Sequence, residues 1–145
     1  MRVVVDTNTL ISALLWQGTP YRLFAALRAT DGIDLFTSPV LLAELTDVLA
    51  RPHFSSRFQH IDKTAERLVD DITRAFVVLR VEPLVQPVCR DPDDDEVLAC
   101  AMAANADFIV SGDADLLSLK VHAGIQILTA AQALALIGED ENSGR

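Results

Sequence analysis

Cysteine is scarce in this sequence, with only Cys89 and Cys100 among 145 residues. Two cysteines without a repeating spacing are too few for a disulfide framework or for a zinc site built from thiolates. Free cysteine is also one of the residue types most often buried in proteins. We therefore expect both to be reduced thiols in apolar surroundings.

Long hydrophobic runs are also missing, although 50% of the residues are hydrophobic. A membrane-spanning helix needs about 20 consecutive apolar residues. The longest candidates here are interrupted by charged residues, namely Asp6, Arg22, Glu44 and Asp71. The first strand-like run starts at residue 2, which leaves no room for an export signal. We expect a soluble, cytoplasmic protein without a membrane partner.

Positive charge is in deficit, since 12 lysines and arginines face 21 aspartates and glutamates and give a formal net charge of −9. Proteins that bind nucleic acid by bulk attraction neutralise its phosphates with basic side chains. The overall charge argues against that class. A polyanion would need a local positive patch or bound cations.

What the sequence does have is an alternation of strand-like and helix-like segments in a chain with the size of one domain. Short runs rich in branched apolar residues predict strands at residues 2–6, 33–38, 107–113 and 124–128. Helical patterns occupy residues 10–16, 20–30, 38–50, 62–79, 94–106 and 129–138. This order predicts a three-layer α/β/α sandwich whose central twisted sheet has four to five mostly parallel strands. We expect one domain over residues 1–138 and a disordered polar tail over residues 139–145.

Two aspartates stand where predicted strands end, because Asp6 follows a run of valines and Asp113 closes the run 107–113. In parallel α/β sheets, ligands bind beyond the carboxyl ends of the strands. If the two strands are neighbours, both acids lie at one edge of the sheet. Each acid taken alone would also suit a helix cap or a turn. Their joint placement favours a shared site.

Glu44 is the third candidate and lies in the helical pattern 38–50. At about 100° of rotation per residue, the buried face of this helix is centred on three apolar residues, Leu41, Leu45 and Val48. Val40 lies on one flank of that face, and Glu44 falls between Val40 and Val48. A carboxylate that faces a core is costly unless it is paired or binds a metal. Glu44 therefore favours a bound cation, with an ordinary salt bridge as the alternative.

The fourth candidate comes from the run of acids from Asp93 to Glu96, which opens a helical pattern. Acids in the first turn of a helix are stabilised by its dipole, so most of this run can serve capping and solvation. Asp95 lies three residues before Leu98 and shares that residue's inward-facing side, so we choose it. Asp94 is its nearest rival.

Carboxylates without converging cysteine or histidine suit a hard divalent cation, Mg²⁺ or Mn²⁺, better than zinc. Such an ion lowers the pKa of water and offsets negative charge on a phosphate. It would also let an acidic protein tolerate a polyanion. We therefore predict a metal site, supported by Thr7 and Asn8, with four ligands: Asp6, Glu44, Asp95 and Asp113.

One segment, residues 51–67, is rich in basic side chains. Six basic or histidine residues there face only two acids, and they are Arg51, His53, Arg57, His60, Lys63 and Arg67. One interpretation is a solvated turn between two helices. The other is a flank that contacts RNA phosphates near an active site through Arg51 and Arg57. The sequence leaves both open.

Several motifs, taken in order, resemble the PIN-domain family, and more specifically its bacterial branch akin to VapC-type toxins. They are VVVDTNTLISALL, SPVLLAEL, RDPDDDEVLACA, DFIVSGDADLL and IQILTAAQAL, and the resemblance covers about residues 2–137. It implies an endoribonuclease in which the four acids bind Mg²⁺ or Mn²⁺. It also implies in-line attack by water on RNA phosphodiesters, leaving 5′-phosphate and 3′-hydroxyl ends.

The same resemblance implies supporting roles for Asn8 and for Ser111, which stands where many members have threonine. Asp115 resembles a further acid of this branch, as a ligand or as structural support. Members are commonly homodimers, and toxins are commonly silenced by an antitoxin protein. The resemblance therefore implies the toxin of a type II toxin–antitoxin system, with a solitary RNA-processing nuclease as the alternative.

Two other classes compete with this interpretation. A phosphatase of the haloacid-dehalogenase type also begins with a strand that ends in aspartate, but it needs a second aspartate two residues later, where this chain has Asn8. An inactive PIN scaffold would only bind RNA or protein. The four intact acids argue against that scaffold.

Overall fold

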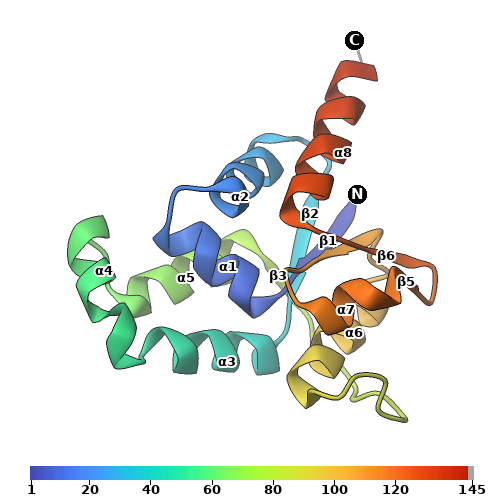
Figure 1. Ribbon diagram of the computed structural model, residues 1–145, viewed down its shortest axis with the longest axis horizontal. Helices are drawn as coiled ribbons and strands as arrows, with labels where there is room; N and C mark the ends of the chain where they lie inside the picture. Colours follow the sequence, from blue (N-terminus) through green and yellow to red (C-terminus); the bar gives the residue numbers. More distant parts are fainter. Residues whose placement is uncertain (144–145) are drawn as a thin grey trace.

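A central sheet with helices on both faces organises the chain (Figure 1). The structure is a computed structural model and describes residues 1–143. The six strands are β1 (Arg2–Val5), β2 (Asp34–Thr37), β3 (Val77–Val78), β4 (Phe108–Val110), β5 (Val121–His122) and β6 (Ile125–Leu128). They lie in the order β3-β2-β1-β4-β6-β5, and every pair is parallel except β5 with β6. The predicted α/β fold with a mostly parallel sheet is confirmed.

The strand number differs from the four to five that the sequence predicts, because β3 and β5 carry no clear sequence signal. Each has two residues, which is too short for an alternating pattern to be recognised. β3 falls inside the predicted helix 62–79, and the observed helix ends at Ala75. Both strands lie at the outer edges of the sheet.

The helices of the described chain are α1 (Thr7–Leu15), α2 (Thr19–Ala29), α3 (Pro39–Leu49), α4 (Ser55–Ile61), α5 (Ala65–Ala75), α6 (Pro92–Ala103), α7 (Ala114–Leu119) and α8 (Ala130–Ser143), with a 3₁₀ turn, η1 (Pro52–Phe54). None of those within residues 1–143 combines the length and hydropathy that a transmembrane helix needs. The tail predicted to be disordered, 139–145, overlaps the end of α8, and its residues 144–145 lie outside the described residues.

Two apolar cores lie on opposite faces of the sheet, because successive residues of a strand point to opposite sides. Val3 and Val5 of β1 pack into the core formed with α1, α2, α3, α5 and α8. Val4 packs into the second core, formed mainly with α6 and α7. Central strands buried on both faces explain the continuous apolar runs in the sequence. The predicted three layers are thus present.

The two cysteines belong to the second core and are not bonded to each other. Cys100 is fully buried, as predicted, whereas Cys89 is only half-buried. Burial raises the pKa of each thiol to about 11. Both are therefore protonated at neutral pH and poor nucleophiles or metal ligands.

Short polar caps start several helices directly after a strand. The Ser38 hydroxyl, followed by Pro39 at the first helical position, accepts a hydrogen bond from the Leu41 amide at 3.2 Å and opens α3. Thr129 and Gln132 exchange two hydrogen bonds at the start of α8. Such caps satisfy amides that have no partner inside the helix. They also fix where each helix leaves the sheet edge.

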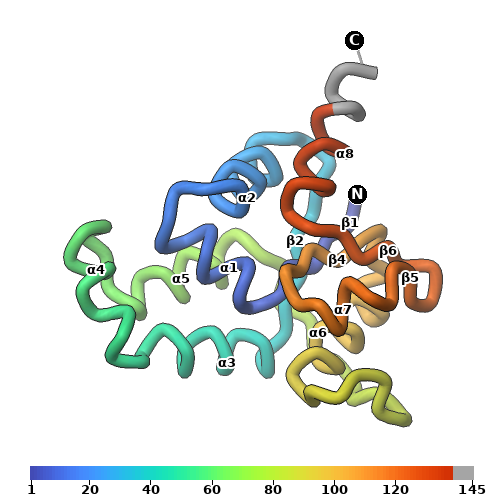
Figure 2. Tube along the Cα trace, viewed as in Figure 1, coloured from blue at the N-terminus to red at the C-terminus, as the bar shows by residue number. Residues whose placement is uncertain are grey.

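Adjacent pairing of β1 and β4 determines where the candidate site lies. From β1 the chain builds β2 and β3 on one side and β4 and β6 on the other, so the strand order reverses beside β1. Val5 pairs with Val110, and the Asp6 amide donates to the Val110 carbonyl at 3.0 Å. The chain trace shows α3 and α6 approaching this same edge, where they contact each other (Figure 2). Ligands bind at such a reversal in open α/β sheets.

Candidate functional site

Asp6 and Asp113 cap the helices that follow β1 and β4. Asp6 Oδ1 accepts from the Thr9 amide at 2.9 Å at the start of α1. Asp113 Oδ1 accepts from the amides of Asp115 and Leu116 at 2.9 and 3.2 Å at the start of α7. A carboxylate has about four lone-pair positions, so capping leaves capacity for a further ligand. Capping therefore fixes the position of each acid without occupying it fully.

Ser111 connects these two capping aspartates. Its side chain is buried, and its hydroxyl donates to Asp6 Oδ2 while it accepts from the Asp113 amide at 2.9 Å. The hydroxyl thus holds the end of β1 against the loop after β4. Asn8 is exposed and lines a shallow pocket of about 390 Å³ that also includes Asp113.

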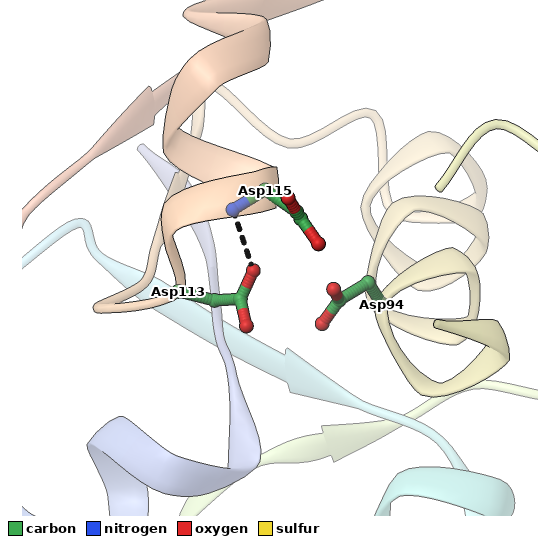
Figure 3. Close-up of side chains that lie close together, drawn as sticks. All are labelled: Asp94, Asp113 and Asp115. Atoms are coloured by element: carbon green, nitrogen blue, oxygen red, sulfur yellow. Dashed lines mark hydrogen bonds between the residues drawn. The ribbon is translucent and has the colours of Figure 1, made fainter. Parts of the chain in front are cut away.

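Three carboxylates converge beside these caps, from Asp94 of α6 and from Asp113 and Asp115 at the start of α7 (Figure 3). One oxygen from each lies within 4.8 Å of the others. Asp94 points from α6 across to Asp113, which lies on the opposite side of the gap. Like charges held this close repel each other unless a proton or a cation intervenes.

Asp94 is the most constrained of the three acids. It is 9% exposed, and its Oδ2 atom is buried without a hydrogen-bond partner among the described residues. Burial, followed by the charge of Asp113, raises its pKa from 3.8 to about 7. A buried oxygen without a donor is costly. The arrangement fits a divalent cation, because carboxylates are the ligands such hard ions prefer.

The prediction that Asp95 is the inward-facing acid is wrong. Asp94, the alternative, is the buried acid that faces Asp113 and Asp115. Asp95 turns toward the preceding loop, where its carboxylate accepts from the amides of Val88 and Cys89, the latter at 2.8 Å. Spacing from Leu98 did not identify the inward side because five consecutive residues of α6 are buried. These are Val97, Leu98, Ala99, Cys100 and Ala101.

Glu44 lies at the border of the buried face of α3. Val40, expected on the flank of that face, is 51% exposed, which places Glu44 at its edge. Burial raises the pKa of Glu44, followed by the charge of Asp93, with Asp6 adding to the rise and the Thr7 side chain opposing it. Glu44 therefore shares the electrostatic field of these acids. It is not one of the three whose oxygens converge within the described chain.

Arg90 is a basic residue of the site that the sequence reasoning missed. Its Nη2 atom lies 2.7 Å from Asp115 Oδ1, and the two side chains are 87% and 41% exposed. The ion pair places an exposed cation beside the acid cluster. The available signal was its position directly before the acid run, in RDPDDD.

Arg51 and Arg57, predicted to contact RNA, are not brought to the acid cluster. Arg57 Nε donates to the carbonyl of Leu15 in the last turn of α1, whose first turn follows Asp6. Leu15 is the last of the nine residues of α1 and Asp6 is its N-cap, so the two lie about 14 Å apart along the helix axis. Arg51 is exposed next to η1. The sequence therefore did not reveal that Arg57 lies one helix length away from Asp6.

Asp94→Asn is expected to stabilise the metal-free protein at pH 8. The Asp94 pKa is about 7 in the folded chain against an ordinary value of 3.8, so the folded state binds more protons between these values and stability falls as pH rises through them. Asparagine cannot ionise and avoids this loss, on the order of 1–3 kcal/mol. Thermal unfolding in EDTA from pH 4 to pH 8 measures the effect.

Asp95→Asn is the matched control for that variant, because it removes the same formal charge from the adjacent residue. It weakens the acceptor for the Val88 and Cys89 amides, so we expect lower stability. An Asp94→Asn protein that keeps the wild-type fall in stability between pH 4 and pH 7 would show that Asp94 is not the strained acid.

Arg90→Ala is expected to tighten binding of Mg²⁺ or Mn²⁺, because the guanidinium competes with a metal for Asp115. The exposed pair is weak, so the gain is about 2- to 5-fold in the dissociation constant. Isothermal titration calorimetry measures it, with Arg80→Ala as the control for general charge, since Arg80 is also exposed in the loop before α6. Equal gains in both variants would refute direct competition.

Two sequence comparisons bear on the family. Residues 2–115 match the model of the PIN domain family. The chain is 31% identical over 126 residues to an uncharacterized protein of Methanocaldococcus jannaschii, and the match covers 83% of this chain and 76% of that protein. The matched residues include all the acids discussed above.

A solved structure shares the fold. It is VapBC2 from Rickettsia felis, crystallised bound to a DNA fragment from the promoter, with a TM-score of 0.59. The alignment covers 88% of this chain and 97% of that chain, at 14% sequence identity. At this identity the likeness concerns the fold alone. The family match, however, spans most of the sequence, and the chain therefore belongs to the PIN-domain family.

Proposed function

We propose that this protein is an Mg²⁺- or Mn²⁺-dependent endoribonuclease. The observation that carries the proposal is the buried, unpartnered Asp94 oxygen that faces Asp113 and Asp115. Membership of the PIN-domain family supports it, because such domains are typically metal-dependent nucleases. Family membership also sets aside the haloacid-dehalogenase-type phosphatase.

The residues proposed to hold the metal are Asp94, Asp113 and Asp115, with Asp6 beside them. Asp94 replaces Asp95 of the sequence-based prediction, since Asp95 anchors the preceding loop. A divalent cation bound by these carboxylates would lower the pKa of water and offset negative charge on the phosphate. The protein would supply fixed positions, because capping and the Ser111 hydroxyl hold Asp6 and Asp113 in place.

Glu44 is the residue best suited to accept a proton from the attacking water. Burial and neighbouring acids raise its pKa, which makes its carboxylate a stronger proton acceptor than an ordinary glutamate. Arg90 would move from Asp115 to a phosphate oxygen of the substrate once the acid cluster is neutralised. This exchange keeps the charge at the mouth of the site balanced.

We further propose that the enzyme acts as the toxin of a type II toxin–antitoxin system and forms a homodimer. The fold likeness to VapBC2 from Rickettsia felis supports this role. A solitary RNA-processing nuclease is the alternative. A short reading frame beside the gene whose product binds this protein and blocks its RNA cleavage would support the toxin role, and a solitary gene would favour the processing enzyme.

RNA cleavage is expected to require divalent metal and to fail in EDTA. Asp94→Asn and Asp113→Asn should each lower the rate by at least about 100-fold, because each removes a charged ligand. Asparagine at 113 keeps the oxygen that caps α7, so the helix should remain formed. The assay measures initial rates on mixed RNA with Mg²⁺ or Mn²⁺, and circular dichroism checks the fold.

Asp95→Asn is the control here as well, and it should retain most of the cleavage activity. Cleavage that persists in EDTA, or that survives Asp6→Asn together with Asp113→Asn, would exclude the metal-dependent mechanism. An inactive scaffold would bind RNA without cleaving it under any of these conditions.

A further inference from the structure

Trp16 is the single tryptophan of the chain and is 45% exposed. It forms the C-cap of α1, at the opposite end of this helix from Asp6. A large aromatic ring costs free energy when it is left in water. A lone exposed apolar residue is ordinary, but a contiguous exposed apolar patch commonly marks an interaction site.

Aromatic and cationic side chains surround this tryptophan. The ring of Phe54 lies edge-on to Trp16, with centroids 6.0 Å apart, and the His53 ring lies 4.1 Å from that of Phe54. The Arg57 guanidinium lies 5.7 Å from the Trp16 centroid. These four residues, His53, Phe54, Trp16 and Arg57, form what we call the aromatic platform.

A backbone contact holds the cation of the platform in place. Arg57 Nε donates to the carbonyl of Leu15, directly before Trp16. A cation at the C-terminus of a helix is also stabilised by the helix dipole. Arg57 is therefore held beside Trp16 before any ligand binds, which lowers the entropic cost of ordering this side chain on binding.

Arginine side chains give the platform local positive charge in an acidic protein, because Arg57 lies against Trp16 and Arg51 lies two residues before His53. Arg51 is exposed and forms no ion pair with an acid in residues 1–138, whereas Lys63 and Arg67 both pair with Asp71. The net charge of the whole chain is −9. This is the local positive patch that a polyanion would need.

From these contacts we infer that the aromatic platform binds a base of single-stranded RNA, with Arg51 contacting the neighbouring phosphate. The inference rests on the proposed ribonuclease function and adds a binding site at the far end of α1. Bases of a single strand stack on aromatic side chains and on arginine planes. The nine residues of α1 separate Asp6 from Trp16, a distance of about 15 Å along the helix axis that a few nucleotides can span.

The single tryptophan provides a readout that does not depend on cleavage. Polyuridylic acid added in EDTA is expected to quench Trp16 fluorescence in a saturable way, since a stacked base contacts the indole ring. Binding should weaken as salt rises, because phosphate contacts release counterions. The duplex of polyadenylic and polyuridylic acid should quench much less, because its bases are already paired and stacked.

Variants then separate stacking from charge. Trp16→Ala should weaken the binding of labelled oligouridylate about 5- to 100-fold, measured by fluorescence anisotropy. Trp16→Phe keeps a stacking face and should retain most of the affinity. Tyr21→Ala is the matched control, because Tyr21 is 46% exposed on α2 and lies outside the platform. Arg51→Ala should weaken binding and flatten its salt dependence.

The outcomes distinguish this inference from the proposed function. RNA that is cleaved with metal but leaves Trp16 fluorescence and Trp16→Ala affinity unchanged would overturn the platform and leave the nuclease intact. Quenching without any metal-dependent cleavage would support the platform and overturn the nuclease. A Trp16 signal that depends on protein concentration alone would identify the surface as a contact between copies and overturn the inference. If Trp16→Ala does not fold, the wild-type titration and Trp16→Phe decide the matter.

Discussion

Parallel pairing of β1 with β4 is the constraint on which the acidic centre depends. It brings the ends of two strands, far apart in the sequence, to one edge of the sheet, where each is followed at once by an aspartate that caps a helix. The Ser111 hydroxyl locks the two ends together. α6 then adds Asp94 from the other face of the sheet. The elements around the site thus hold carboxylates close together although their negative charges repel each other.

The acids of this centre serve the fold and the site with different oxygen atoms and lone pairs. Capping by Asp6 and Asp113 satisfies backbone amides at two helix starts, and Asp95, outside the cluster, accepts from amides of the preceding loop. Asp94 differs from them, because it is buried without such a partner. The buried Asp94 lowers the stability of the fold, and the hydrogen bonds of the neighbouring acids raise it. This combination is expected where a protein retains a site for a ligand.

Much of this architecture could be predicted from the sequence, because the central strands are long apolar runs and the acids follow them directly. Asp6 and Asp113 were predicted in this way to lie at one edge of the sheet, and the pairing of their strands places them there. The inward acid of α6 could not be chosen, since five consecutive residues of the helix are buried. The spacing of apolar residues therefore does not indicate which side of this helix faces inward. β3 and β5 were too short to produce a pattern. Trp16 and Arg57 became neighbours only through folding, because 41 positions separate them along the chain.

The outermost strands, β3 and β5, end the sheet with two residues on either side. A strand this short exposes few unpaired amides and carbonyls, so it offers little template on which another chain could extend the sheet. Edge-to-edge growth into larger β assemblies is thereby discouraged, even though Val77 and Val78 are exposed there. We therefore expect contacts with other molecules to involve the helices and the loops that join them.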